Sequence, residues 1–224
     1  MSNVEPSAGP RPDTADIRAV HSGLRREFRL FPSLLTEATA AGDGARVGAL
    51  LDHWTLITGL LHHHHEGEDD LLWPLLADRS AAPELIASMK DQHSAMVTTL
   101  DQAEVVVSGW AEPGPSGGGQ AGTDLAPLLR LAEEITEHFD AEEGEVLPLC
   151  QDLLNQEEWE ALGTRGRASV PPEQLPVVAC LFLEDADADA VTAFLAPMPP
   201  EVRALATGPW QEAYAGYVRT LRGG

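Results

Sequence analysis

Apolar side chains recur at alternating steps of three and four through most of the first 154 residues of the chain. Such steps place side chains on one face of a helix, because an α-helix has about 3.6 residues per turn. The pattern predicts four long amphipathic helices, at 13–41, 44–77, 83–107 and 124–154. Helices of this kind pack most economically as an antiparallel four-helix bundle, so the predicted fold class is all-α.

The second predicted helix carries a long seam of core-facing positions. Its members are Val47, Leu50, Trp54, Ile57, Leu61, His64, Glu68 and Leu71. In the first predicted helix, Pro32 interrupts an otherwise regular pattern. Because proline lacks a backbone N–H and its ring crowds the preceding turn, we expect Pro32 to kink this helix or split it in two.

Breaks in the pattern divide the chain into three parts. Residues 1–12 are rich in Pro, Gly and Ser and are expected to form a flexible tail, followed by the bundle at 13–154. A Gly-rich stretch at 109–123 predicts a flexible loop inside the bundle. Residues 155–224 predict a C-terminal helical extension, which opens on a capping box formed by Asn155 and Glu158. Its further helices are expected at 172–184, 189–195, 200–206 and 209–221.

Charge and cysteine content narrow the function classes. The chain has 14 Lys and Arg against 36 Asp and Glu, a formal net charge of −22. This balance argues against binding to nucleic acid or to an anionic membrane surface. The sequence has no apolar run of the ~20 residues that span a bilayer and no secretory signal at its N-terminus. Cys150 and Cys180 lie outside any CxxC motif. We therefore expect reduced thiols and a cytoplasmic protein.

Each of the four seams contains one histidine, and two contain a glutamate one helical turn later. The histidines are His21, His64, His93 and His138, and the glutamates are Glu68 and Glu142. A bundle core normally excludes ionisable groups, because burying them unpaired is costly. A pair of metal ions would resolve this cost, since imidazole nitrogens and carboxylate oxygens suit iron, manganese and zinc.

The second and fourth helices also repeat one motif. The segments beginning at His64 and at His138 align without gaps, with Glu four residues later and Pro ten residues later in both. His21 and His93 are each followed by Ser. The repeat predicts a pseudo-two-fold bundle with two metals bridged by both carboxylates.

These residues resemble those of the hemerythrin-like, HHE cation-binding proteins, over roughly residues 13–154. The resemblance implies a non-haem di-iron centre, with two iron ions joined by an oxo or hydroxo bridge. It also implies that the centre binds oxygen, or reacts with oxygen, peroxide or nitric oxide. A small diatomic ligand or peroxide is therefore the expected partner.

The chain departs from the oxygen-carrying members of that family. Those proteins have a fifth histidine from an HxxxH pair on the third helix, where this chain has Met89 and Val97. They also use an HxxxxD spacing on the fourth helix, where Glu143 takes that register here. We favour Glu142, because the i,i+4 spacing aims both side chains at one face. Fewer histidines would leave more open coordination positions and favour redox reactivity over reversible oxygen carriage.

The remaining histidines and acids have simpler interpretations. His65 is the best substitute or additional ligand, whereas His62 and His63 are expected to face away from the core. His53 lies one step off the seam and is predicted at the surface. The nearby acids are expected to be solvated, with one of them accepting a hydrogen bond from a ligand imidazole. These acids are Glu66, Asp69, Asp70, Glu143 and Glu145.

Three functions remain open at this level. The leading hypothesis is a di-iron protein that binds or senses a small diatomic ligand. The alternative is a di-iron oxidoreductase that consumes peroxide or oxidises an organic substrate, with the C-terminal helices as a lid. The third is iron storage or buffering.

Overall fold

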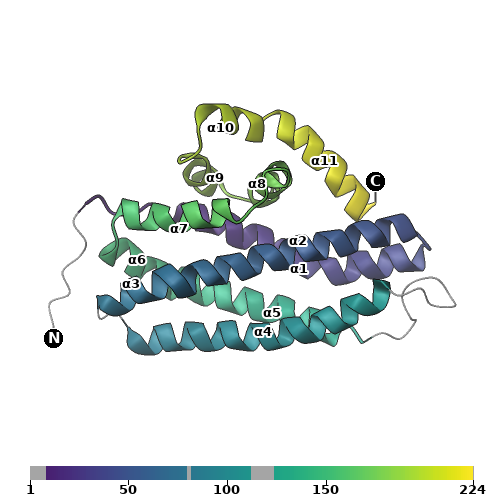
Figure 1. Cartoon of the computed structure of the whole chain (residues 1–224), viewed down its shortest axis with the longest axis horizontal. Coiled ribbons are helices and arrows are strands. Elements are labelled where there is room, and N and C mark those ends of the chain that lie inside the picture. Colours follow the sequence, from purple (N-terminus) through teal and green to yellow (C-terminus); the bar gives the residue numbers. More distant parts are fainter. Residues whose placement is uncertain (1–8, 80–81, 112–123, 224) are drawn as a thin grey trace.

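The computed structural model describes residues 9–79, 82–111 and 124–223. All regular structure in these ranges is helical, which confirms the all-α prediction (Figure 1). Four rods form the bundle. They are α1 (Ala15–Ala40); α2 (Gly44–Gly67) continuing through η1 (Glu68–Leu72) into α3 (Trp73–Asp78); α4 (Pro83–Ala111); and α5 (Ala126–Ala141) continuing through η2 (Glu142–Val146) into α6 (Leu147–Leu153).

The first rod, α1, runs through Pro32 as a single helix, so the expected split does not occur. The flanking Phe31 and Leu35 are fully buried in the bundle core, and this packing outweighs the loss of one backbone hydrogen bond. The predicted tail lies outside the described residues up to residue 8. Within the described part, the Pro10 carbonyl accepts a hydrogen bond from the Gln156 N–H at 3.0 Å. The predicted loop lies outside the described residues from 112 to 123.

Both copies of the repeated motif contain a π-helical turn at the same place. The Trp73 N–H donates to the Glu68 carbonyl, and the Leu147 N–H donates to the Glu142 carbonyl, five residues back in each case. A proline follows each turn and cannot donate a backbone hydrogen bond. A π-helical turn contains about one residue more than an α-helical turn, which shifts the buried position that follows it. Leu72 is therefore the buried residue after Glu68, and the prediction of Leu71 at this position was wrong.

The C-terminal part consists of α7 (Gln156–Ala168), α8 (Leu175–Leu183), α9 (Ala188–Leu195), α10 (Pro200–Ala206) and α11 (Pro209–Arg222). The predicted capping box opens α7: the Asn155 side chain accepts from the Glu158 N–H at 2.9 Å, and the Glu158 carboxylate accepts from the Asn155 N–H at 3.0 Å. Helices α8 and α9 pack on α1, and α11 packs on α2 and α8, so these helices lie over one side of the bundle (Figure 1).

A close crossing fixes α8 against α1. A Cβ atom placed on Gly23 would lie 2.8 Å from Phe182 Cδ1 and 3.0 Å from Leu181 Cδ2. Only glycine allows the two helices to approach this closely without a shift. Within the described ranges, no helix combines the length and apolar composition needed to cross a membrane.

The buried apolar side chains form two clusters, one on each side of the bundle centre. The larger includes Ile57, Leu61 and Ile135, and the smaller includes Leu72 and Val146. Along the second and fourth rods, the predicted histidine and glutamate positions fall between these clusters. The core is thus apolar at both ends and polar in the middle.

Candidate metal centre

The bundle centre brings together all the side chains that the sequence predicted as metal ligands. They form two groups, and the ligand atoms within each group lie within 4.8 Å of one another. One group is His21, His64, Glu68 and Glu142, and the other is His65, His93 and His138. All of these side chains are buried except that of His64, which is partly buried. The arrangement therefore offers two adjacent sites for a cation.

His65 is the seventh member of the cluster. Consecutive residues of α2 face different groups: His64 lies in the first group and His65 in the second. The His65 ring stacks on that of His93 at a centroid distance of 4.1 Å, and its Nε2 atom has no hydrogen-bond partner in the described structure. The cluster thus contains five imidazoles. His65, which the sequence suggested as a substitute or additional ligand, thus supplies a ring that position 89 or 97 of α4 does not.

Both glutamates of the first group also reach the second group. Glu68 Oε1 is 3.1 Å from His64 Nε2, and Glu68 Oε2 is 3.3 Å from His93 Nε2. Glu142 Oε2 is 3.3 Å from His21 Nε2 and 4.0 Å from His138 Nε2. Each carboxylate therefore contacts one imidazole of each group, which is the geometry that a bridging ligand needs.

Polar groups outside the cluster orient three of the imidazoles. His21 Nδ1 lies 2.9 Å from Glu143 Oε1, and His93 Nδ1 lies 3.3 Å from Asp69 Oδ1. His138 Nδ1 lies 2.9 Å from Gln92 Oε1. Because these oxygens accept hydrogen bonds, each Nδ1 atom carries the proton and donates it. The Nε2 atom of each neutral ring then presents a lone pair to the bundle interior.

The inward Nε2 atoms lie close to one another in two pairs. His21 Nε2 is 3.3 Å from His64 Nε2, and His93 Nε2 is 3.2 Å from His138 Nε2. Glu68 Oε2 and both carboxylate oxygens of Glu142 have no hydrogen-bond partner in the described structure. A buried cluster of unsatisfied acceptors is unfavourable on its own. Nitrogen and oxygen donors in this arrangement fit divalent or trivalent cations such as iron, manganese or zinc.

Burial keeps most of the imidazoles neutral. It lowers the pKa of His64 to about 3 and that of His138 to about 4, and it lowers the pKa of His65 well below its usual value. Burial also lowers the pKa of His21, but the neighbouring Glu142 and Glu143 raise it overall. Burial and the charge of Glu142 raise the pKa of Glu68. Protonation of His64, His65 or His138 is thus a costly way to relieve the close approach of ring nitrogens, and a metal cation is the better one.

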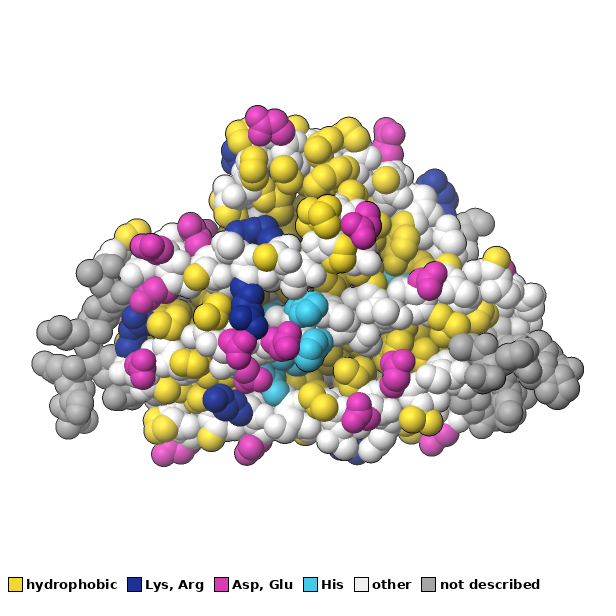
Figure 2. Space-filling model, viewed as in Figure 1, with side chains coloured by type: hydrophobic (Ala, Val, Ile, Leu, Met, Phe, Trp, Pro, Cys, Tyr) yellow, Lys and Arg dark blue, Asp and Glu magenta, His cyan; other side chains and the backbone are white. Residues whose placement is uncertain are grey.

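The outer residues of the cluster largely follow the predictions. Glu143 and Asp69 accept hydrogen bonds from ligand-type imidazoles, as expected for one of the nearby acids. His62 and His63 are exposed as predicted, and both contact Glu66. Figure 2 shows histidine side chains at the surface near the middle of the bundle, beside acidic side chains.

The surface prediction for His53 was wrong. This side chain is 1 % exposed, with Nε2 3.1 Å from Glu27 Oε2 and Nδ1 2.7 Å from the Tyr217 hydroxyl. Helix α11 covers this face of α2, so a position that is off the bundle seam is nevertheless buried. Glu27 and its neighbour Arg26 were also missed, because they lie on the face of α1 that the C-terminal helices cover.

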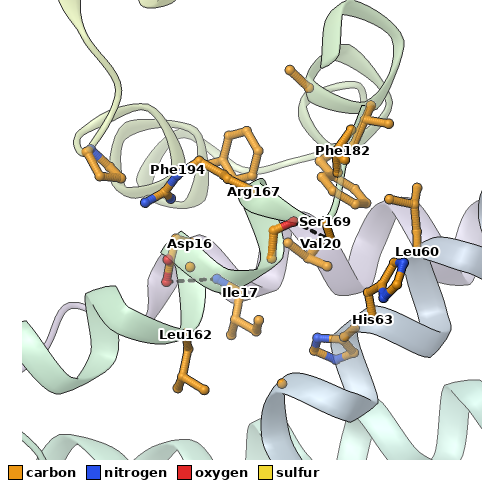
Figure 3. A pocket seen from close by; sticks show the side chains of 18 of the residues that line it. Asp16, Ile17, Val20, Leu60, His63, Leu162, Arg167, Ser169, Phe182 and Phe194 are labelled. Atoms are coloured by element: carbon orange, nitrogen blue, oxygen red, sulfur yellow. Dashed lines mark hydrogen bonds between the residues drawn. The ribbon is translucent and has the colours of Figure 1, made fainter. Parts of the chain in front are cut away.

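A cavity of about 350 Å³ lies between the bundle and the C-terminal helices (Figure 3). His64, Glu68 and Glu142 contribute to its wall, so the cavity reaches the first group of the cluster. Most of the other lining side chains are apolar. The first group of the cluster is therefore reached from a mostly apolar space.

The fold and the cluster define an all-α bundle with a cation-binding centre of histidine and glutamate side chains. A comparison with family models agrees: residues 13–150 match the hemerythrin HHE cation binding domain, and the chain belongs to this family. No curated protein and no solved structure matches the chain. The family match ends before α7, so the helices that roof the cavity lie outside it.

Proposed function

We propose that the cluster holds two iron ions bridged by Glu68 and Glu142, and that this centre binds or reacts with oxygen, nitric oxide or peroxide. The Nε2 atoms of His93 and His138 carry the proposal, because they lie 3.2 Å apart and each ring donates its Nδ1 proton to an oxygen outside the cluster. Membership of the HHE family favours a metal cation at this place. When bound, a reduced iron pair supplies the electrons and the open coordination positions that such small ligands require.

The protein's own residues would hold this centre in distinct ways. His21 and His64 would hold one metal, His65, His93 and His138 would hold the other, and Glu68 and Glu142 would donate oxygens to both. Glu143, Asp69 and Gln92 would fix the imidazole orientations through Nδ1, which also makes the rings better donors. The surrounding apolar side chains would keep bulk water away and so tune the redox potential.

An oxidoreductase is the second candidate, and the cavity is the observation that favours it. An apolar space next to His64, Glu68 and Glu142 could admit peroxide or an organic substrate. Storage is less well supported, because the cluster is buried and offers two sites with no further ligand group among the described residues. We also propose a cytoplasmic location, which the free and buried thiols of Cys150 and Cys180 support.

Metal analysis of protein purified without an affinity tag tests the cofactor. We expect two irons per chain in the wild type and a loss of iron in His64→Ala. The matched control is His62→Ala, two residues away on the same helix but exposed, which should keep its metal. One zinc per chain and no iron would contradict the proposal.

Optical spectroscopy tests the reactivity. Adding oxygen or nitric oxide to anaerobic ferrous protein should change the near-ultraviolet and visible absorption, and no change would exclude both ligands. Peroxide consumption should separate the enzyme from the carrier or sensor. An equal rate in the wild type and in Glu68→Ala would exclude the cluster as a catalyst.

A further inference from the structure

The cavity between the bundle and the C-terminal helices has the size and lining of a ligand site. Its volume of about 350 Å³ lies within the range of small-molecule pockets, roughly 300–1,000 Å³. Val20 and Leu60 line it from the bundle, and Leu162, Phe182 and Phe194 line it from α7, α8 and α9 (Figure 3). A space this apolar selects a ligand with an extended apolar part.

Polar and charged side chains interrupt the apolar lining of the cavity at a few positions. His64, Glu68 and Glu142 belong to the metal cluster. Arg167, on α7, lies beside Phe194 and across the cavity from His63 in Figure 3. One cavity wall thus contains both a guanidinium group and part of the cluster.

Arg167 lacks an acidic partner. Among the residues that the structure describes, no carboxylate lies within ion-pair distance of its guanidinium group, and Nη2 donates to Thr164 Oγ1 at 3.1 Å. Asp16 also lines the cavity, but its Oδ1 atom already accepts from Trp159 Nε1 at 2.9 Å and from the Ile17 N–H at 3.0 Å. Burial raises the pKa of this carboxyl group, and the hydrogen bond from Trp159 partly offsets the rise.

We propose that this cavity binds an organic monocarboxylate, with its carboxylate at Arg167 and its apolar tail extending toward His64, Glu68 and Glu142. Arg167 matches a carboxylate in geometry as well as in charge, because a guanidinium group can donate two parallel hydrogen bonds. In a chain with a net charge of −22, an anion needs such a local cation to bind.

The roof of the cavity is held in place before any ligand binds. Arg26 Nη2 donates to the Leu181 carbonyl at 2.7 Å, which ties α8 to α1. The Tyr214 hydroxyl donates to Glu184 Oε2 at 2.6 Å, and Arg222 Nη1 donates to Glu184 Oε1 at 2.6 Å, which ties α11 to the end of α8. A preformed cavity saves the free energy of ordering its walls on binding.

Calorimetric titration of the full-length protein with octanoate and with 1-octanol tests the head group. We expect octanoate to bind at least tenfold more tightly than octanol in the wild type. Arg167→Gln should weaken octanoate about tenfold and leave octanol nearly unchanged. Arg203→Gln is the matched control, since Arg203 is an exposed arginine of α10 outside the cavity lining. Equal affinity for the two ligands in the wild type, or an unchanged preference in Arg167→Gln, would overturn the proposal.

A second pair of variants tests the place of binding. Gly166 lines the cavity within α7, and a Cβ atom added there meets nothing within 4 Å. Gly166→Leu should therefore fold, partly fill the cavity and weaken both ligands at least tenfold. Gly48→Leu is the control, since Gly48 is an equally unobstructed helical glycine outside the cavity. Undiminished octanoate binding to a helical Gly166→Leu protein would refute the site.

This inference does not depend on the identity of the metal. Measuring metal content in the same Arg167 and Gly166 variants separates the two proposals, because neither residue belongs to the cluster. We expect their metal content to equal that of the wild type while octanoate affinity falls. A parallel loss of metal in both variants would show disruption of the bundle centre and would overturn the assignment of a separate carboxylate site.

Discussion

Histidines of α2 meet buried carboxylates at two places, about three turns apart. At the first place, His53 contacts Glu27 Oε2 and the Tyr217 hydroxyl, while Arg26 Nε donates to Glu27 Oε1 at 2.7 Å. At the second place, the imidazoles of the metal cluster present facing lone pairs to one another and to orphaned carboxylate oxygens.

The two places contain similar residue types but differ in whether the buried carboxylates have hydrogen-bond and ion-pair partners. Arg26 and Arg222 both donate to Glu27, so its charge is balanced within the protein. No basic side chain contacts Glu68 or Glu142 among the described residues apart from the imidazoles themselves. A satisfied buried cluster stabilises an interface between elements, whereas an unsatisfied one is typical of a ligand or metal site.

The largest effect is expected from breaking the satisfied cluster. His53→Leu removes a partner of buried Glu27 and of half-buried Tyr217, so the free energy of unfolding should fall by about 3–5 kcal/mol. Urea unfolding measures this loss, and metal content should stay unchanged. The control His62→Leu alters an exposed histidine of the same helix and should change stability by less than about 0.5 kcal/mol. A loss of metal in His53→Leu would show that metal binding also depends on the His53–Glu27 cluster, contrary to this comparison.

Acid should weaken the same cluster in a defined pH window. Burial raises the pKa of Glu27, but His53 and Arg26 lower it overall, from 4.5 to about 2. Its contribution to stability is therefore complete above pH 4.5 and is lost as the pH falls toward 2. The shift corresponds to roughly 3 kcal/mol. In metal-stripped wild type, the free energy of unfolding should therefore fall across this window by that amount more than in metal-stripped Glu27→Gln. Parallel curves would contradict the assigned role of Glu27.

A smaller effect is expected at the crossing of α1, the helix that carries Glu27, with α8. Gly23→Ala places a Cβ atom 2.8 Å from Phe182 Cδ1, so α8 or the Phe182 ring must shift. We expect a loss of about 1–2 kcal/mol despite the better helix propensity of alanine. Gly48→Ala, with nothing within 4 Å, should instead stabilise the protein by up to about 1 kcal/mol. Equal thermal shifts for the two variants would show that the helix crossing has no tight contact.

The smallest effect has the opposite sign and concerns the unsatisfied cluster. His65→Leu removes an orphaned Nε2 atom from the core, so the metal-free protein should become about 1 kcal/mol more stable. The same variant should lose half or more of the bound metal. Chemical denaturation after chelation, together with metal analysis, measures both quantities. A destabilised metal-free His65→Leu protein would place His65 with His53 among the structural histidines.

Sequence reasoning could reach the bundle and six members of the cluster because both follow one helical period. His21, His64, His93 and His138 lie on the same seams as the apolar core, and the burial they imply needs an explanation. Adjacent His64 and His65 could not be separated in this way, since residues 100° apart on α2 can both face the bundle centre. The structure places one in each ligand group.

Helices α1 and α2 each have a second buried face, which one apolar seam per helix does not predict. Glu27 on α1 and His53 on α2 are off the seam and are covered by helices that begin more than a hundred residues later. The match between Pro74 and Pro148 was visible as a repeat, but its link to a π-helical turn follows only from the backbone hydrogen bonds.

The sequence by itself determined the helical rods, their repeat and the identity of most of the residues at the bundle centre. These depend on local periodicity and on the cost of burying ionisable groups. The tertiary structure alone decided which of those groups are satisfied, where the C-terminal helices pack and that an apolar cavity leads to Glu68 and Glu142. Such properties depend on distances between side chains far apart in the chain, and no local pattern encodes them.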